Sequence, residues 1–353
     1  MSTYFSLPND NATTTVTVPK NTTQLILGLF ASGNAEEEFW YTNLPNEYNA
    51  TFYKNWNITF LGEGSFREVA VWLDDEVVGV AWPFEVVFTG GINPGFWQPV
   101  VGHRTFDLPS YQVDLTPFLD KLAGKERRIR FTMAGQPETL QNWFVSGHLQ
   151  VRCAKHGHRG DVSTQPDLDE YKVSPRANVS VSGRVSKDNS SFTVVTKATR
   201  HGGKYTLDYT NQQSNRLLHN ATVAIQNISQ STYFTTPFST GHFLLALDSK
   251  EVDHGNKTAT FSITLSQTFY RCTTDIHGYK TEEHAEVRTS GRIHFGKHNK
   301  NRADANTSVS LSVKSPGREY VRSVKASRYK ILSDYEVDRS VSHIWPYDEE
   351  DRR

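Results

Sequence analysis

An acidic and aromatic run at residues 36–41, EEEFWY, concentrates chemically capable side chains. Its three adjacent carboxylates repel one another, which raises the pKa of at least one of them and suits that group to general acid catalysis. The neighbouring Phe39 and Trp40 offer aromatic faces on which the C–H groups of a sugar ring can stack. The run therefore favours sugar chemistry, in which one of the three carboxylates acts as a general acid and Trp40 offers a stacking face. The alternative is a solvated loop anchored to the core by its aromatic rings.

A second candidate segment lies at residues 82–102, where Gly90 and Gly91 let the backbone approach a ligand closely. Asn93 offers a hydrogen bond and Trp97 a stacking face, so both are candidate substrate-binding residues. The alternative is a wide loop held by its prolines.

Arg67 and Glu68 begin an expected strand and are further candidates for substrate binding. In a strand, the default interpretation of such a pair is an ion pair with a neighbouring strand. Asp107 and Asp114 are expected to end strands or cap turns rather than to catalyse.

Several common catalytic signatures are missing from the sequence: the phosphate loop, the dinucleotide-binding glycine motif, the serine elbow and the zinc-binding HExxH motif. His156 and His158 lie in a hydrophilic stretch, where such a pair is expected to face solvent. No metal and no cofactor are therefore expected.

Composition narrows the possible partners. The 353 residues carry 38 Lys and Arg against 38 Asp and Glu, so the formal net charge is zero and a nucleic-acid partner is not expected. Aromatic residues make up 12% of the chain, which is typical of a folded protein rather than a disordered one. No apolar stretch approaches the roughly 18 residues that a membrane-spanning helix needs.

The sequence also carries features of a secreted protein. Ten Asn-x-Ser/Thr glycosylation sequons are present, where about four are expected by chance. They begin at Asn11, Asn21, Asn49, Asn57, Asn178, Asn189, Asn220, Asn227, Asn256 and Asn306. The first residues nevertheless lack the basic and apolar regions of a signal peptide. Cys153 and Cys272 are candidates for one disulfide, with two unrelated thiols as an equal alternative.

Short runs rich in β-branched and aromatic residues predict strands throughout the chain. In the first half they cover Thr13–Val18, Gln24–Phe30, Trp56–Phe60, Phe66–Leu73, Val77–Ala81, Glu85–Thr89, Arg128–Ala134 and Trp143–Arg152. In the second half they cover Asn178–Val185, Phe192–Thr199, Lys204–Tyr209, Ala221–Asn227, Phe243–Leu247, Thr258–Cys272, Ala285–Phe295 and Thr307–Val313. A single short connecting helix is expected from Thr116 to Gly124, with Pro117 in its first turn.

These elements predict an all-β protein of antiparallel β-sandwich or jelly-roll domains arranged in two lobes. The apolar pattern lapses between Lys155 and Pro175, which places a domain boundary there. The expected division is a β-sandwich over residues 1–155, a linker over 156–175, a second β-sandwich region over 176–342 and a tail over 343–353.

Four ordered strings resemble the peptide-N-glycosidase A family, the plant and fungal glycoamidases that cleave N-glycans from asparagine. They are EEEFWY at 36–41, FREVAVWLDDEVVG at 66–79, PFEVVFTGGINPGFWQPVVG at 83–102 and FDLPSYQVDLTPF at 106–118. The resemblance is close over about residues 20–152 and thinner beyond 175.

This resemblance implies hydrolysis of the side-chain amide of glycosylated asparagine, with an N-glycosylated peptide or glycoprotein as substrate and a secretory or vacuolar location. It places Glu37 and Glu38 on the family's acidic pair, and Trp40, Asn93 and Trp97 in its loops. It does not decide which carboxylate is the catalyst.

The chain also departs from the family pattern. Its acidic pair is Glu37-Glu38 where Asp-Glu is usual, and Glu85 stands where a proline is common. Gln98 and Gln112 replace an arginine and an aspartate, and an expected upstream histidine is missing. Members of the family carry a signal sequence and a further strand-rich segment before the matching region. The chain is therefore expected to be a truncated gene model, a fragment or a shortened relative, and an inactive form is the alternative to an active hydrolase.

Two other functions remain open. One is a carbohydrate-binding or structural β-sandwich without catalysis. The other is a glycosidase, which requires two carboxylates about 5–10 Å apart around a sugar bond.

Overall fold

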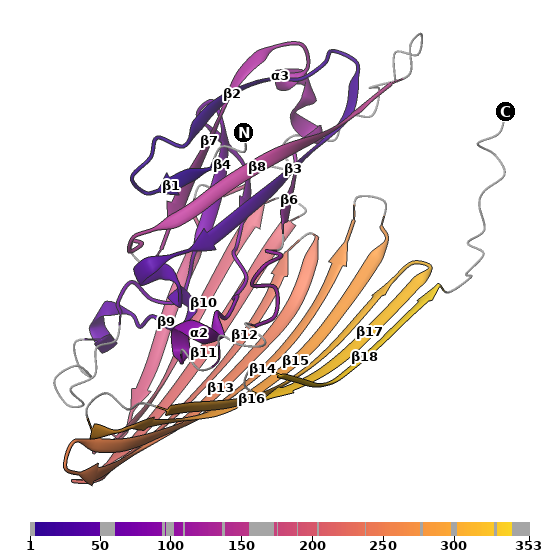
Figure 1. Ribbon diagram of the computed structural model, residues 1–353. Helices are drawn as coiled ribbons and strands as arrows, with labels where there is room; N and C mark the ends of the chain where they lie inside the picture. The colour runs from indigo at the N-terminus through magenta and orange to yellow at the C-terminus, as the bar shows by residue number, and fades with distance from the viewer. Residues whose placement is uncertain are drawn as a thin grey trace. The chain divides into compact units, whose positions relative to one another are not determined.

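The structure is a computed structural model of the chain. It describes residues 4–340 apart from 50–60, 94–95, 97–101, 109, 136–137, 155–172, 175, 189, 203–204, 237, 276–277, 298–301 and 328–329. The described residues are mainly antiparallel strands with a few short helical turns (Figure 1), which confirms the predicted all-β class.

The first half forms two four-stranded antiparallel sheets, in the orders β1-β8-β3-β6 and β2-β7-β4-β5. Their strands are β1 (Phe5–Leu7), β2 (Thr13–Thr17), β3 (Thr22–Gly33), β4 (Glu68–Leu73), β5 (Glu76–Ala81), β6 (Tyr111–Asp114), β7 (Glu126–Ala134) and β8 (Trp143–Cys153). A β-carbon on Gly147 of β8 would stand 3.5 Å from the Phe131 ring of β7, so the two sheets pack closely. The core between them contains Leu25, Leu29 and Val145, which are fully buried.

Short helical turns connect these strands. They are the 3₁₀ turns η1 (Ala35–Glu37), η2 (Trp40–Thr42) and η4 (Thr116–Phe118), and the helices α2 (Thr89–Ile92) and α3 (Leu119–Leu122). The turns η4 and α3 together confirm the helix predicted at Thr116.

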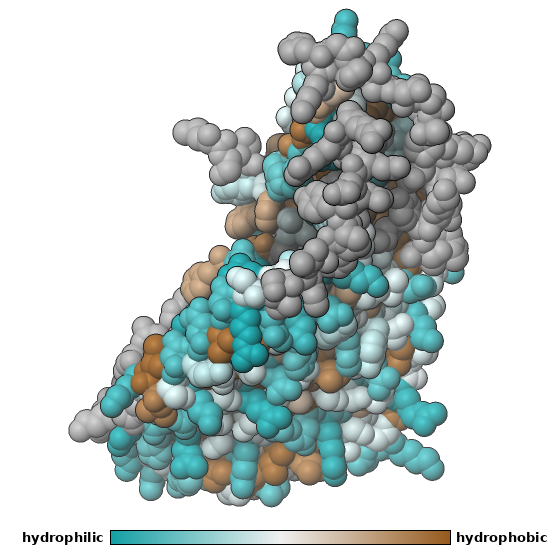
Figure 2. All heavy atoms as spheres, turned by 90° about the vertical axis from the view of Figure 1, so that its right-hand side faces the viewer, coloured by the Kyte–Doolittle hydropathy of each residue, from teal (hydrophilic) through white to brown (hydrophobic). Residues whose placement is uncertain are grey.

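The second half forms one ten-stranded antiparallel sheet, in which the strands follow one another in chain order from β9 to β18. They are β9 (Asn178–Val185), β10 (Ser191–Gly202), β11 (Tyr205–His219), β12 (Val223–Thr236), β13 (Ser239–Gly255), β14 (Thr258–Thr274), β15 (Lys280–Phe295), β16 (Arg302–Ser315), β17 (Arg318–Ser327) and β18 (Lys330–Ser340). Figure 2 shows a face on which hydrophilic residues predominate and hydrophobic residues form small separate groups. This agrees with strands that alternate polar and apolar residues.

The chain divides into two compact units. The first contains Met1–Phe88, Gly102–Leu217 and Gln230–Pro237, and the second contains Thr89–Val101, Leu218–Ser229 and Phe238–Arg353. The first unit therefore includes both small sheets with β9, β10 and most of β11. The predicted linker lies largely outside the described residues, so the predicted domain bounds stay a prediction.

One strand prediction is wrong. Residues 85–88 have no regular structure, and Thr89 begins α2. The backbone amide of Phe84 donates to the hydroxyl of Tyr111 at 2.6 Å rather than to a strand neighbour. Burial alternates along the segment, with Glu85 and Val87 buried and residues 86 and 88 half-buried, which explains the strand-like composition. The strand predicted at Trp56–Phe60 lies outside the described residues.

Candidate functional site

The acidic run begins directly after β3, where the chain turns back sharply through η1. The amide of Glu37 donates to the carbonyl of Asn34 at 3.0 Å, and the amide of Glu38 donates to that of Ala35 at 3.1 Å. A β-carbon on Gly33 would stand 2.2 Å from the carbonyl oxygen of Glu37, so only glycine allows this turn. The turn sends the three glutamates into different surroundings: Glu36 is exposed, Glu37 is fully buried and Glu38 is half-buried.

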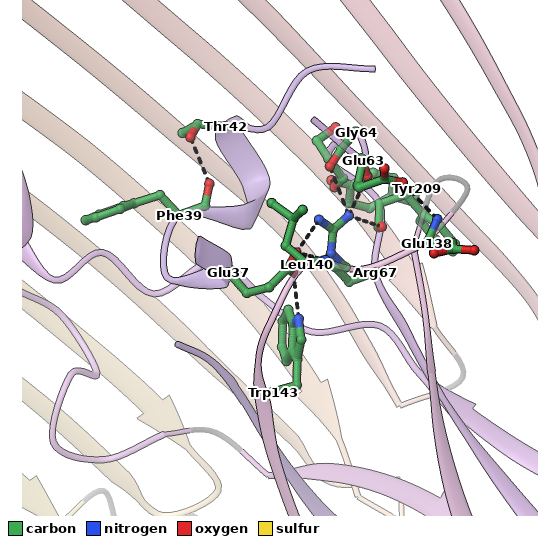
Figure 3. Close-up of polar contacts among 12 residues, drawn as sticks. Glu37, Phe39, Thr42, Glu63, Gly64, Arg67, Glu138, Leu140, Trp143 and Tyr209 are labelled. Carbon is green, nitrogen blue, oxygen red and sulfur yellow. Dashed lines mark hydrogen bonds and ion pairs between the residues drawn. The ribbon is translucent and has the colours of Figure 1, made fainter. Parts of the chain in front are cut away.

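Each oxygen of the Glu37 carboxylate accepts two hydrogen bonds (Figure 3). The Arg67 guanidinium donates to it twice, from Nε at 2.5 Å and from Nη2 at 2.8 Å. The Trp143 indole donates to the same carboxylate at 2.7 Å and the Leu140 amide at 2.8 Å. A bidentate arginine pair with two further donors compensates the charge of a buried carboxylate.

Arg67 is in turn held by backbone carbonyls. Its Nη1 donates to the carbonyl oxygens of Glu63, Gly64 and Phe66 at 2.8, 2.9 and 2.8 Å. Both Glu63 and Gly64 have positive φ, which forms the turn that presents these oxygens. The Glu37–Arg67 pair therefore ties η1, the turn before β4 and the start of β8 together.

Glu68 forms a second buried ion pair, with Arg200 of β10. Its other oxygen accepts a hydrogen bond from the Trp82 indole at 2.8 Å. The rings of Trp82 and Phe66 pack with Tyr209 in a buried cluster. Arg67 and Glu68 thus pair with different partners, and both pairs lie in the interior.

Glu85, which stands where the family commonly has a proline, is a buried carboxyl group. It is 3% exposed, and burial raises its pKa to about 7. Thr232 of β12 hydrogen-bonds to it, while its Oε1 has no hydrogen-bond partner among the described residues. Asn211 of β11 donates to Thr232 at 2.9 Å and accepts from Ser65 at 3.2 Å, which extends the polar network.

Two buried tyrosines lie close to these carboxyl groups. Burial raises the pKa of Tyr41, and the charges of Glu85 and Glu38 raise it further. Burial and Glu85 likewise raise the pKa of Tyr209, whose hydroxyl donates to the carbonyl of Ser65 at 2.7 Å. Partial burial raises the pKa of Glu38 itself. A half-buried carboxyl with a raised pKa can hold and release a proton at the protein surface.

The binding residues predicted in the loops differ in where they lie in the structure. Trp40 is 3% exposed and packs against Tyr41 and Trp143, at ring-centroid distances of 5.8 Å in both cases. Asn93 is 2% exposed and belongs to the second unit, while Trp97 lies outside the described residues. The binding roles of Trp40, Asn93 and Trp97 stay predictions.

The remaining predicted sites are distributed over the chain. Cys153 and Cys272 are both free in the structure and belong to different compact units, so the bridge and the alternative of two separate thiols both stay predictions. Of the sequon asparagines, six are exposed and two are half-buried; Asn57 and Asn189 lie outside the described residues. The exposed ones are Asn11, Asn21, Asn178, Asn220, Asn256 and Asn306, and the half-buried ones are Asn49 and Asn227.

No group of three or more metal-binding side chains occurs among the described residues, and His156 and His158 lie outside them. Within the same part of the chain, no helix has both the length and the apolar character needed to cross a membrane.

Comparison with known proteins finds similarity within the first half of the chain. Residues 1–167 match the family model of peptide N-acetyl-beta-D-glucosaminyl asparaginase amidase A. The chain is 39% identical over 175 residues to the peptide-N4-(N-acetyl-beta-glucosaminyl)asparagine amidase A of Prunus dulcis. The aligned region covers 49% of this chain and 29% of that relative, so the chain spans less than a third of the relative's length. No solved structure matches the chain. The similarity to the peptide N-acetyl-beta-D-glucosaminyl asparaginase amidase A family thus covers residues 1–167 of the 353.

Proposed function

We propose that the protein hydrolyses the amide bond between an N-linked glycan and the asparagine side chain of a glycopeptide. The observation that carries this proposal is the family match over residues 1–167, which includes the acidic run and the glycine-rich loop. The name of the Prunus dulcis relative supports the same activity. Because the chain covers 29% of that relative, the activity of the whole relative is proposed here for a shorter chain.

Among the acidic residues, Glu38 is the proposed catalytic group. Its side chain is half-buried and its raised pKa favours the protonated form that a general acid needs. Glu37 is the proposed positioning residue, since four hydrogen bonds already occupy both of its carboxylate oxygens.

The proposed chemistry is a direct hydrolysis. A water molecule attacks the amide carbon of the glycosylated asparagine, and the carbon–nitrogen bond breaks as Glu38 donates a proton to the departing nitrogen. The products are aspartate in the peptide and a glycosylamine, and the proton lost from the attacking water restores Glu38.

The full chain incubated with an N-glycopeptide tests this proposal. Mass spectrometry is expected to detect the gain of about 1 Da that marks conversion of asparagine to aspartate, together with loss of the glycan. Glu38→Gln removes the proton donor and is expected to lower the rate by about 100-fold or more. Glu36→Gln, which changes an exposed neighbour, is expected to keep the wild-type rate. Absence of conversion by the wild-type chain contradicts the hydrolase proposal.

A carbohydrate-binding protein without catalysis is the second candidate. The burial of Glu37, Arg67 and Glu68 in internal ion pairs favours it, because these charged side chains are occupied by one another or by Arg200 rather than available for catalysis. Binding on a glycan array without conversion of the glycopeptide identifies this alternative.

A further inference from the structure

The second compact unit contains a loop from the family-matched region. Residues 89–101 belong to this unit together with residues 238–353. Within the loop, the amide of Asn93 donates to the carbonyl of Thr89 at 3.1 Å, and the amide of Phe96 donates to that of Asn93 at 2.8 Å. The Thr89 hydroxyl donates to the Phe96 carbonyl at 3.1 Å and closes the loop. Thr89, Asn93 and Phe96 are all at most 2% exposed.

The Phe96 ring occupies the space above a glycine in the middle of β15. A β-carbon built on Gly291 would stand 2.4 Å from Cε1 and 3.3 Å from Cδ1 of Phe96. It would also stand 2.9 Å from the carbonyl oxygen of Asp304 in β16. Any side chain larger than hydrogen at position 291 therefore displaces the aromatic ring.

The neighbours of Gly291 across the sheet support this assignment. Gly291 pairs with Ile263 of β14 and with Ala305 of β16, and directly paired residues point to the same face of the sheet. Ile263 and Ala305 are each 3% exposed, so this row of the sheet is covered. Glycine inside a strand is unfavourable unless another group must approach the backbone closely, and Phe96 is such a group.

We propose that Gly291 is a positioning residue that seats Phe96 and thereby fixes the loop carrying Asn93. Gly291 lies outside the family-matched residues 1–167, while Asn93 and Phe96 lie inside them. Within the second unit, a residue of the second half of the chain thus positions a loop of the family-matched region. The contact between Phe96 and Gly291 is argued from geometry alone, whereas its effect on catalysis rests on the proposed function.

Hydrogen exchange of the full chain tests the packing of Phe96 on Gly291 without an activity assay. In Gly291→Ala and in Phe96→Ala, the amides of residues 93 and 96 are expected to exchange about tenfold faster or more. The amide of Leu140, which bonds to Glu37 in the first unit, is expected to keep its rate. Ser290→Ala, which changes an exposed neighbour of Gly291, is the matched control and is expected to match wild type.

A double variant separates a specific clash from general destabilisation. Gly291→Ala combined with Phe96→Leu leaves room for the new methyl group, so loop protection is expected to recover towards that of Phe96→Leu alone. Unchanged exchange in both Gly291→Ala and Phe96→Ala overturns the proposal, as does a purely additive double variant.

Glycopeptide hydrolysis by the same variants provides the functional readout. A higher KM with an unchanged kcat is expected for Gly291→Ala, because the loop is assigned to substrate binding. If wild type shows no hydrolysis, the proposed function fails while the exchange experiment still decides whether Gly291 seats the loop. If wild type is active and Gly291→Ala keeps both constants, the functional part of this inference is wrong.

Discussion

Adjacent residues Glu37 and Glu38 differ in what surrounds their carboxyl groups. The Glu37 carboxylate is fully buried and accepts hydrogen bonds from Arg67, Trp143 and a backbone amide. The Glu38 carboxyl is half-buried and its pKa is raised. The acidic run therefore combines a fixed anchor with a group able to exchange protons.

Glu37→Gln tests the anchor. Glutamine keeps a similar shape but leaves the Arg67 charge buried without its partner, so the free energy of unfolding is expected to fall by about 3–5 kcal/mol. Urea or guanidinium unfolding measures the change. The exposed neighbour provides the control, since Glu36→Gln is expected to change stability by less than about 0.5 kcal/mol. Equal stabilities of the two variants would show that the ion pair does not anchor the turn.

Glu85 predicts a pH dependence of stability. Its folded-state pKa of about 7 lies above the ordinary 4.5, so the folded protein retains a proton that the unfolded chain releases. The resulting stabilisation is complete below pH 4.5 and is lost as the pH rises through about 7. A shift of this size corresponds to roughly 3 kcal/mol.

Unfolding curves at about pH 5 and pH 8 measure this contribution. Glu85→Gln stays neutral at both values, so its loss of stability between them is expected to be smaller than that of wild type. Glu126→Gln, at an exposed position, is expected to follow wild type. A wild-type slope in Glu85→Gln contradicts the assignment.

At the level of elements, β11 contacts the end of the acidic run through the side chain of Gln213. Gln213 is 7% exposed and donates to the carbonyl oxygens of Tyr41 at 2.8 Å and Asn43 at 3.3 Å. The preceding residue, Gln212, points to the opposite face and is exposed. One strand thus provides a buried and an exposed glutamine side by side.

Gln213→Ala removes a hydrogen-bond donor from both buried carbonyl groups. A loss of about 1–3 kcal/mol in the free energy of unfolding is expected. Gln212→Ala uses the same substitution on the exposed face, and its cost is expected to stay below about 0.5 kcal/mol. Chemical denaturation of both variants makes the comparison, and similar losses would argue against a structural role for Gln213.

Many of these elements could be predicted from the sequence because their polarity alternates with period two. Polar and apolar residues alternate from Thr258 to Ser266, and the strand predicted at Thr258–Cys272 is confirmed as β14. Strands β17 and β18 were not predicted, since charged residues occupy them and few apolar residues mark a buried face. The Glu37–Arg67 pair joins residues 30 positions apart, and no local pattern reveals such a pairing.

At the level of the whole molecule, the family match and the first compact unit end at different residues. The match ends at residue 167, whereas the first unit continues through β9, β10 and most of β11. Phe66 and Trp82 of the matched region bury their rings against Ala198, Leu207 and Tyr209. Part of the core of the matched region is therefore supplied by residues beyond it.

A fragment limited to residues 1–167 tests this dependence. Without β10 and β11, the rings of Phe66 and Trp82 lose their buried partners, and the Glu68 carboxylate loses Arg200. An exposed apolar surface and an unpaired charge are both unfavourable, so the fragment is expected to aggregate or to lack fixed tertiary packing. Near-ultraviolet circular dichroism and urea unfolding compare the fragment with the full chain, in which Trp82 is 4% exposed. A fragment that unfolds cooperatively at the midpoint of the full chain would show that the matched region is complete by itself.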